Sequence, residues 1–233
     1  MERLDKIIAS QTEYSRKDVK YLALNKKLTV NGEIVRRSDI KVDPEKNEIA
    51  INGKPMLVKK YVYLILNKPE GYISATEDKS QATVLELIPE EFKCRDVFPV
   101  GRLDKDTTGL MILSDDGEFA HNILAPKKHV EKEYEVTVDI KVTEEMKQGF
   151  LEGVDLNDGV CKTAILEITG DYTANVILTE GRYHQIKRMF GCFGAKVVKL
   201  HRTRMGKLVL PNDLEVGDSR ELTEEEIKLL TTR

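Results

Sequence analysis

The chain has 233 residues, 40% hydrophobic and 33% charged, with a formal net charge of −3, which predicts a globular protein with a buried core. No apolar run approaches eighteen residues and the amino terminus lacks a signal-peptide stretch, so we expect no membrane span and a cytoplasmic location. Three widely spaced cysteines without CxxC spacing exclude a disulfide framework and a zinc site, and the 6% aromatic content without Trp disfavours extended stacking platforms for single-stranded nucleic acid.

The charge is unevenly distributed along the chain. Residues 1–60 carry 14 Lys and Arg against 9 Asp and Glu, whereas the remaining residues carry 23 against 31. Within that acidic remainder, residues 181–212 contain eight basic side chains and no acidic one. Either region alone is typical of a solvated charged face, but two such regions together favour a polyanionic ligand such as a nucleic acid.

The first sixty residues predict a compact module of helices and hairpins. Ser15 opens a helix with Asp18 as its capping-box partner, and the helix carries Arg16, Lys17 and Lys20 in its first turns. The segment 28–35 alternates around Asn31-Gly32, which predicts a tight hairpin, and a second Asn-Gly follows at residues 52–53.

The segments RLDKIIA and SRKDVKYLALNKKLTVNGEIV carry a resemblance over about fifty residues. They resemble the S-four RNA-binding domain, a small α/β module whose basic helix and hairpin side chains bind folded RNA. The resemblance implies an RNA-binding domain over residues 1–58 and a second domain over residues 59–233.

The sequence of the second domain predicts strands at residues 61–69, 109–114, 132–138, 163–168 and 174–179. Helices are expected after Gly117, around Glu144–Leu151, at Tyr183–Phe193 and at the carboxyl end, where Thr223 and Glu226 form a capping box. This order predicts an α+β domain with a mixed, largely antiparallel sheet.

A polar loop between two apolar runs, FPVGRLDKDTTGLMILSDDG at residues 98–117, is where a scaffold displays catalytic side chains. Asp104, Asp106, Thr108 and Gly109 also occupy positions one, three, five and six of a calcium-loop pattern. Asp115 stands where that loop needs a glutamate and no entering helix precedes it, so calcium is disfavoured.

The same loop resembles the signature of the pseudouridine synthase superfamily, in which the Asp of the RLD triplet is the essential carboxylate. The resemblance makes Asp104 catalytic, gives Arg102 a role in positioning the nucleotide, and lets Thr107, Thr108 and Gly109 shape the loop. Asp106 is expected to brace the loop as a hydrogen-bond acceptor.

Two further segments resemble the same superfamily. KEYEV places Tyr134 where the family's tyrosine packs against uracil, and EGRYHQIKRMFGCFG supplies Lys187 as the cation that pairs with the catalytic Asp. Ile186, Phe190 and Phe193 form one apolar stripe, which leaves His184 and Lys187 on another face. Further RNA contacts are expected from Arg182, His184, Gln185, Arg188, Arg202 and Arg204.

The resemblance implies an RNA pseudouridine synthase that needs no metal or cofactor and works as a monomer, with ribosomal RNA as its partner. LHRTRMG and EGRYHQIKRMF most resemble the members that act on small-subunit (16S) ribosomal RNA. Three alternatives stay open: a synthase for 23S ribosomal RNA, an inactive RNA-binding or ribosome-assembly protein, and a metal-dependent RNA hydrolase.

Overall fold

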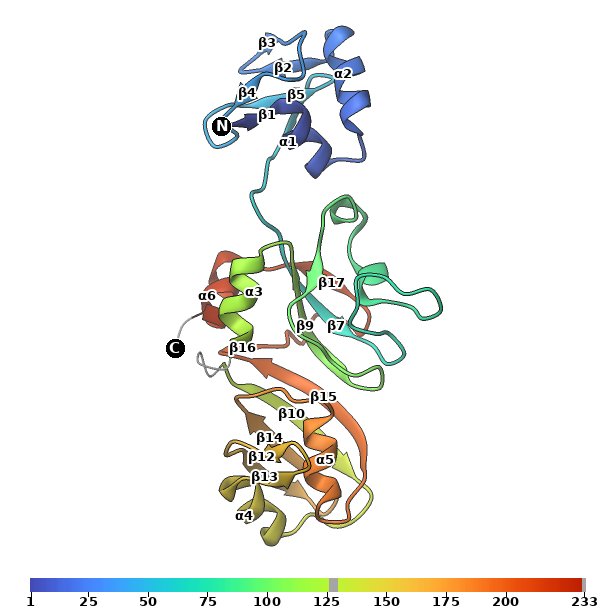
Figure 1. Ribbon diagram of the computed structural model, residues 1–233, viewed down its shortest axis with the longest axis vertical. Helices are drawn as coiled ribbons and strands as arrows, with labels where there is room; N and C mark the ends of the chain where they lie inside the picture. The colour runs from blue at the N-terminus through green and yellow to red at the C-terminus, as the bar shows by residue number, and fades with distance from the viewer. Residues whose placement is uncertain (126–129, 232–233) are drawn as a thin grey trace. The chain divides into compact units, whose positions relative to one another are not determined.

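The computed structural model describes residues 1–125 and 130–231, and the chain divides into two compact units (Figure 1). The N-terminal unit comprises Met1–Val62 and Pro89–Asp96, and the sheet unit comprises Tyr63–Ile88 and Val97–Arg233. The expected boundary after residue 58 lies close to the first transition, whereas residues 89–96, expected in the second domain, group with the first unit.

Short helices and hairpins build the N-terminal unit. Its helices are α1 (Leu4–Gln11), α2 (Arg16–Leu24) and a 3-10 turn at Glu90–Phe92. Its strands are β1 (Glu2–Arg3), β2 (Leu28–Val30), β3 (Glu33–Ile34), β4 (Lys41–Val42), β5 (Ile49–Ile51) and β6 (Lys54–Met56). The strands β3-β2-β5-β6 form an antiparallel sheet, β1 pairs with β4, and the helices bury Leu4, Ile8 and Val19 in the core of this unit.

Local sequence signals explain these elements. The Ser15 hydroxyl accepts the Asp18 amide while the Asp18 carboxylate accepts the Ser15 amide, so the predicted capping box is confirmed. Both predicted Asn-Gly turns are confirmed between β2 and β3 and between β5 and β6, with positive φ at all four turn residues.

One sheet organises the second unit. Its order is β13-β14-β10-β15-β9-β7-β17, with β16 paired to β15 and β8 paired to β9. The strands are β7 (Tyr63–Lys68), β8 (Phe98–Pro99), β9 (Thr108–Ser114), β10 (Lys132–Val138), β13 (Ile165–Gly170), β14 (Thr173–Leu178), β15 (Val197–Met205), β16 (Leu208–Val209) and β17 (Ser219–Glu221). Of these pairings only β9 with β15 is parallel, so the predicted mixed, largely antiparallel sheet is confirmed in the described residues.

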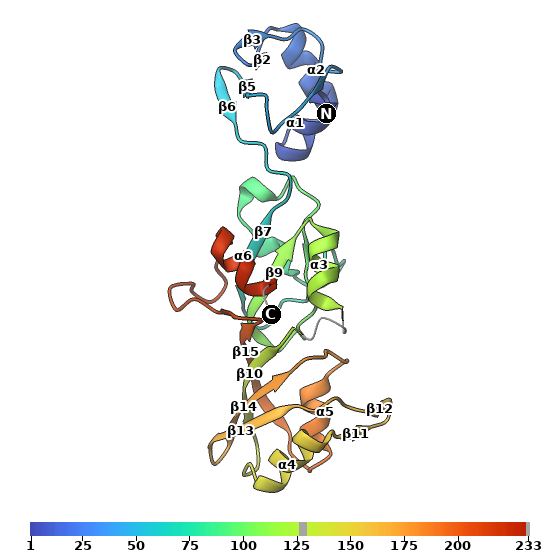
Figure 2. The same ribbon diagram turned by 90° about the vertical axis from the view of Figure 1, so that its left-hand side faces the viewer.

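In the described part of the chain, four helices pack on this sheet (Figures 1 and 2). They are α3 (Gly117–Leu124), α4 (Glu144–Glu152), α5 (Gln185–Gly191) and α6 (Glu224–Thr231). The unit also contains a 3-10 turn at Val84–Leu87 and a hairpin of β11 (Asp155–Leu156) and β12 (Gly159–Val160). Helices α3 and α6 cover a core that includes Ile65, Ile112 and Phe119, whereas α4 lies against β13 and α5 against β15.

The helix α5 is shorter than the expected Tyr183–Phe193. Ile186, Met189 and Phe190 are buried on its inner face, and the Phe190 ring lies 4.9 Å from the ring of Phe150 on α4. Phe193 comes after the last helical residue and is only half-buried, because the chain has already turned toward Gly194. None of the helices in residues 1–125 and 130–231 is long and apolar enough to cross a membrane.

Candidate active site

A buried lysine forms hydrogen bonds with the backbone of the loop between β8 and β9. The Lys68 ammonium, at the end of β7, is fully buried and donates to the carbonyl oxygens of Asp104 at 3.1 Å, Lys105 at 3.3 Å and Thr107 at 2.8 Å. Burial lowers the pKa of Lys68 to about 8, although the carboxylates of Asp106 and Asp104 act in the opposite direction. The loop is therefore fixed by its backbone, which leaves its side chains available for other contacts.

Sequence reasoning missed Lys68, which it included only as part of a predicted strand. The available signal was a lysine one residue after an apolar run and directly before a proline, since a lysine at the end of a buried strand needs acceptors.

Thr108 and Gly109 join the loop to the sheet. Gly109 has φ +98°, and a Cβ there would lie 2.3 Å from the carbonyl oxygen of Arg202, so only glycine allows β9 to approach β15. The Thr108 hydroxyl lies 2.8 Å from Nδ1 of His201 on β15. Thr107 is buried, and its hydroxyl has no partner among the described residues.

Asp104 lies between two side chains from the start of α5. Its Oδ2 is 3.1 Å from Nζ of Lys187, and its Oδ1 is 3.4 Å from Nε2 of His184. The carboxylate keeps 26% of its side-chain surface exposed, so a ligand can reach it. The structure thus brings together Asp104 and Lys187, which lie far apart in the sequence.

Asp106 also contacts Lys187, with its Oδ1 2.5 Å from the ammonium. Its side chain is 61% exposed and its carboxylate accepts a hydrogen bond from this cation, so it is an acceptor as expected, while its role in bracing the loop stays a prediction. Burial lowers the pKa of Lys187, but the bonds to Asp106 and Asp104 outweigh that effect and leave the pKa raised. The pKa of Asp106 is lowered, because the contact with Lys187 outweighs its partial burial.

Asp104, His184 and Lys187 line a pocket together with apolar side chains, which we call its floor. Tyr134 on β10, Leu178 on β14 and Leu200 on β15 line the floor, and all three are buried. Arg102 lines the rim and is exposed. A flat, uncharged ring can lie against such a floor while its polar edge faces the carboxylate and the ammonium.

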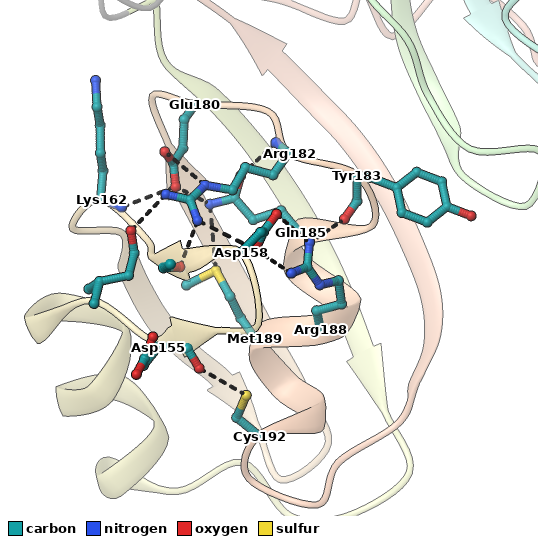
Figure 3. Close-up of polar contacts among 12 residues, drawn as sticks. Asp155, Asp158, Lys162, Glu180, Arg182, Tyr183, Gln185, Arg188, Met189 and Cys192 are labelled. Carbon is teal, nitrogen blue, oxygen red and sulfur yellow. Dashed lines mark hydrogen bonds and ion pairs between the residues drawn. The ribbon is translucent and has the colours of Figure 1, made fainter.

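The loop before α5 is braced by its own side chains (Figure 3). Arg182 donates to the carbonyl oxygens of Gly159 and Val160, each at 2.7 Å, and so ties the loop to the β11–β12 hairpin. Gln185 is buried and bonds to Glu180 and to the Arg182 amide, while Arg188 pairs with Asp158. Arg182, Gln185 and Arg188, all expected to contact RNA, therefore have partners within the protein.

The expectation that Arg202 extends an RNA-facing surface is wrong. Its side chain is 2% exposed, and its Nε donates to the Leu110 carbonyl oxygen at 2.6 Å, because β15 is an interior strand of the sheet. Arg204 forms ion pairs with Glu133 at 2.7 Å and Glu131 at 3.1 Å, so other segments neutralise part of the acid-free stretch.

The remaining predicted contacts lie in the N-terminal unit. Arg16, Lys17 and Lys20 are exposed on α2, where Val19 and Leu22 face the core. Within residues 1–125 and 130–231, no group of three or more His, Cys, Asp or Glu side chains is arranged to hold a metal ion.

Comparison with known proteins agrees with this geometry. Residues 62–191 match the family model described as RNA pseudouridylate synthase. The chain is 41% identical to the ribosomal small subunit pseudouridine synthase A of Escherichia coli strain K12, over 97% of this chain and 98% of the relative. It is also 41% identical to an uncharacterized RNA pseudouridine synthase of Bacillus subtilis, with 98% of each chain covered.

Among solved structures, the chain is similar to a crystal structure of a pseudouridylate synthase, with a TM-score of 0.70 and 38% identity. That similarity covers 99% of this chain and 100% of the other. The family match spans the loop of Asp104, the strand of Tyr134 and the helix of Lys187. The chain therefore belongs to the RNA pseudouridylate synthase family and is an RNA-modifying isomerase.

Proposed function

We propose that this protein converts one uridine of small-subunit ribosomal RNA to pseudouridine, with Asp104 as the catalytic carboxylate. The observation that carries the proposal is the accessible Asp104 carboxylate, 3.1 Å from the Lys187 ammonium and lining the same pocket as Tyr134. The small-subunit assignment is supported by relatives named for that subunit that cover nearly the whole chain. That RNA makes the cytoplasm the expected location.

The reaction conserves every atom of the substrate. The bond between ribose C1′ and uracil N1 breaks, the uracil turns within the pocket, and C5 forms the new bond to C1′, with its proton lost and a proton gained at N1. The ionised Asp104 assists either as a nucleophile at a ribose or uracil carbon or as the base that removes a ribose proton. Lys187 pairs with the carboxylate and holds it in place, and the Tyr134 ring packs against the uracil.

The uridine has to leave the RNA stack to reach Asp104. Extrusion of a base costs a few kcal/mol, which packing in the pocket and phosphate contacts offset. We assign Arg102 at the exposed rim to the phosphate or ribose of the extruded nucleotide. The basic side chains of α2 supply affinity for the surrounding RNA rather than chemistry, which assigns residues 1–58 to binding and residues 59–233 to catalysis.

Chemical mapping of pseudouridine in ribosomal RNA tests the proposal. Cells that lack the protein are compared with cells that carry the parent, Asp104→Asn or Asp106→Asn. We expect one uridine of the small-subunit RNA to be unmodified without the protein, restored by the parent, and not detectably restored by Asp104→Asn. Asp106→Asn should restore it, because that carboxylate contacts Lys187 but does not line the pocket.

The outcomes separate the alternatives. Loss of a pseudouridine from the large-subunit RNA instead would contradict the small-subunit assignment. Restoration of the pseudouridine by Asp104→Asn would contradict the catalytic role. Single-turnover conversion by the purified protein with EDTA present separates an isomerase from a metal-dependent hydrolase, since only a hydrolase would be inhibited and would release cleaved RNA. Sedimentation of the protein with and without RNA tests the expected monomer.

A further inference from the structure

An exposed aromatic ring lies beside the pocket without a role in the proposed chemistry. Tyr183 is 71% exposed, although the chain is poor in aromatic residues. One face of its ring stacks on the His184 ring, with centroids 3.8 Å apart and an angle of 17° between the planes. His184 in turn contacts Asp104, so the His184 ring links the tyrosine ring to the proposed catalytic carboxylate.

The backbone that carries this ring is fixed by the network of Figure 3. The carbonyl oxygen of Tyr183 accepts a hydrogen bond from Arg188 at 3.1 Å, and Arg188 is itself paired with Asp158. His184 adopts the left-handed conformation, with φ +48°, and its carbonyl accepts the Arg188 amide at the start of α5. Such constraints hold an exposed ring in one orientation and reduce the entropy lost when a ligand stacks on it.

The position of the ring determines which part of the substrate it can meet. Arg182 and His184 line the pocket, whereas Tyr183 between them does not. Figure 3 shows the Tyr183 ring directed away from the polar network of Arg182, Asp158 and Arg188. A base on its outer face would therefore lie outside the pocket that holds the extruded uracil.

We propose that the outer face of Tyr183 is a stacking site for a nucleobase adjacent to the extruded uridine in the RNA. The inference rests on the proposed function, because it is extrusion that removes a stacking partner from each neighbouring base. The tyrosine ring replaces one of these partners, and His184 supports the ring from the other side. An aromatic platform accepts any base, so the site selects for an unstacked neighbour and not for a sequence.

A cycle that combines protein and RNA changes tests the proposal. The RNA is a short fragment around the uridine identified by mapping, in either ribosomal subunit, prepared intact or with a single abasic nucleotide at each flanking position. Dissociation constants are measured by fluorescence anisotropy for the parent, Tyr183→Ala and Tyr183→Phe. Tyr172→Ala is the matched control, because Tyr172 is a 53% exposed tyrosine of the same unit that does not line the pocket.

We expect Tyr183→Ala to weaken binding of the intact RNA about tenfold, and Tyr183→Phe and Tyr172→Ala to change it less than twofold. At one flanking position, removal of the base should weaken binding by the parent protein by a similar factor. On that abasic RNA, Tyr183→Ala should weaken binding no further. The stacking site would be overturned if Tyr183→Ala and the parent bound the intact RNA equally. It would also be overturned if, at every flanking position, the loss of affinity from Tyr183→Ala multiplied the loss from the missing base.

Single-turnover rates at saturating RNA separate this inference from two other results. If Tyr183 only positions His184, Tyr183→Ala would lower the rate without changing the dissociation constant, and the proposal would be wrong. If the parent converts no uridine in the mapped fragment, the proposed function fails, whereas an active parent with unchanged binding by Tyr183→Ala contradicts the stacking site alone.

Discussion

At the scale of single residues, the site depends on one ammonium that serves two carboxylates. Lys187 lies 3.1 Å from Asp104 and 2.5 Å from Asp106. A lysine carries three donors on a compact charge and contacts both acids, whereas the planar guanidinium of an arginine is best suited to bidentate pairing with one. The ammonium therefore holds the Asp104 carboxylate in position through a direct ion pair.

Replacement of Lys187 tests this arrangement. Lys187→Met leaves two neighbouring carboxylates without their cation, so we expect single-turnover conversion to fall about a hundredfold or more while RNA binding changes little. Lys187→Arg should stay within about tenfold of the parent because charge is retained. The double variant Lys187→Met/Asp106→Asn should recover part of the loss, since the repelling neighbour is removed. A loss in binding that equals the loss in rate would identify Lys187 as a phosphate contact instead.

Lys68 shows how a buried cation can support a site that it does not enter. Lys68→Met leaves the carbonyl oxygens of Asp104, Lys105 and Thr107 without this donor, and each unsatisfied buried carbonyl costs about 1–3 kcal/mol. We expect lower stability at neutral pH and a loss of conversion, measured by urea denaturation and single-turnover kinetics. Lys132→Met is the control, because Lys132 is also buried but donates to the Val130 carbonyl oxygen outside the loop.

The lowered pKa of Lys68, about 8, also predicts a pH effect on stability. Between about pH 8 and the ordinary lysine value of about 10.4, the unfolded chain binds more protons than the folded one, so the free energy of unfolding rises with pH. Burial likewise lowers the pKa of Lys132 to about 8, so both lysines contribute in this window. The increase in the free energy of unfolding between about pH 8 and 10 should therefore be smaller in Lys68→Met than in the parent. An unchanged increase would contradict a buried ammonium at this position.

At the scale of elements, the parallel contact between β9 and β15 places the loop of Asp104 beside the strand that completes the pocket floor. Gly109 allows the contact, since a side chain would meet the backbone of Arg202. The start of α5 then supplies Lys187 and His184 from the opposite side. Each of these positions depends on a pairing between segments that are distant in the sequence.

A substitution at Gly109 tests the importance of that contact. Gly109→Ala should destabilise the sheet unit by at least about 2 kcal/mol, because the backbone has positive φ and the new Cβ meets the Arg202 carbonyl. Gly117→Ala, at the first position of α3 with open space around its Cβ, should change stability little. Urea denaturation of the two variants measures the difference, and equal stability would show that β9 can move away from β15 at no cost.

At the scale of the whole molecule, binding and chemistry are assigned to different units of the chain. The first sixty residues carry a net positive charge, and Arg16, Lys17 and Lys20 are exposed on one helix. The side chains that we propose as catalytic all belong to the sheet unit, where several basic residues already have acidic partners. We therefore expect the salt dependence of RNA binding to come mainly from the N-terminal unit.

Neutralising α2 measures this contribution without removing the unit. Substitution of Arg16, Lys17 and Lys20 by Gln should weaken RNA binding, while conversion at saturating RNA is retained. The slope of the logarithm of the binding constant against the logarithm of the salt concentration should become shallower, because up to about three fewer counterions are released. The comparison is a triple Gln variant at Lys41, Lys46 and Lys54, which are exposed elsewhere in the same unit. Equal effects of the two triple variants would indicate a diffuse charge effect rather than a binding helix.

A truncation after residue 58 is a less direct test than these substitutions. Gln11 on α1 accepts a hydrogen bond from Arg95 at 2.7 Å, and both residues belong to the N-terminal unit. Deletion of residues 1–58 would remove one of the partners of Arg95, so lost activity could reflect damage to residues 89–96 as well as lost RNA binding.

The amino-acid sequence by itself determined the local elements of this protein. Capping boxes, Asn-Gly turns and the alternation of KEYEVTV depend on partners a few residues away, so they predict the starts of α2 and α6, the turns of the two hairpins and the bounds of β10. The family resemblance also selected Asp104, Tyr134 and Lys187, which the fold gathers in one pocket.

Only the tertiary structure decided which charges are paired and which are exposed. Lys187 meets Asp106 across 81 positions, Arg204 meets Glu133 across 71 and Arg188 meets Asp158 across 30, so an acid-free stretch of sequence acquired acidic partners from elsewhere. The burial of Lys68 and Arg202 depends in the same way on neighbouring strands and loops. Local patterns record which conformation a segment prefers, whereas ion pairs and burial depend on the segments that the fold brings beside it.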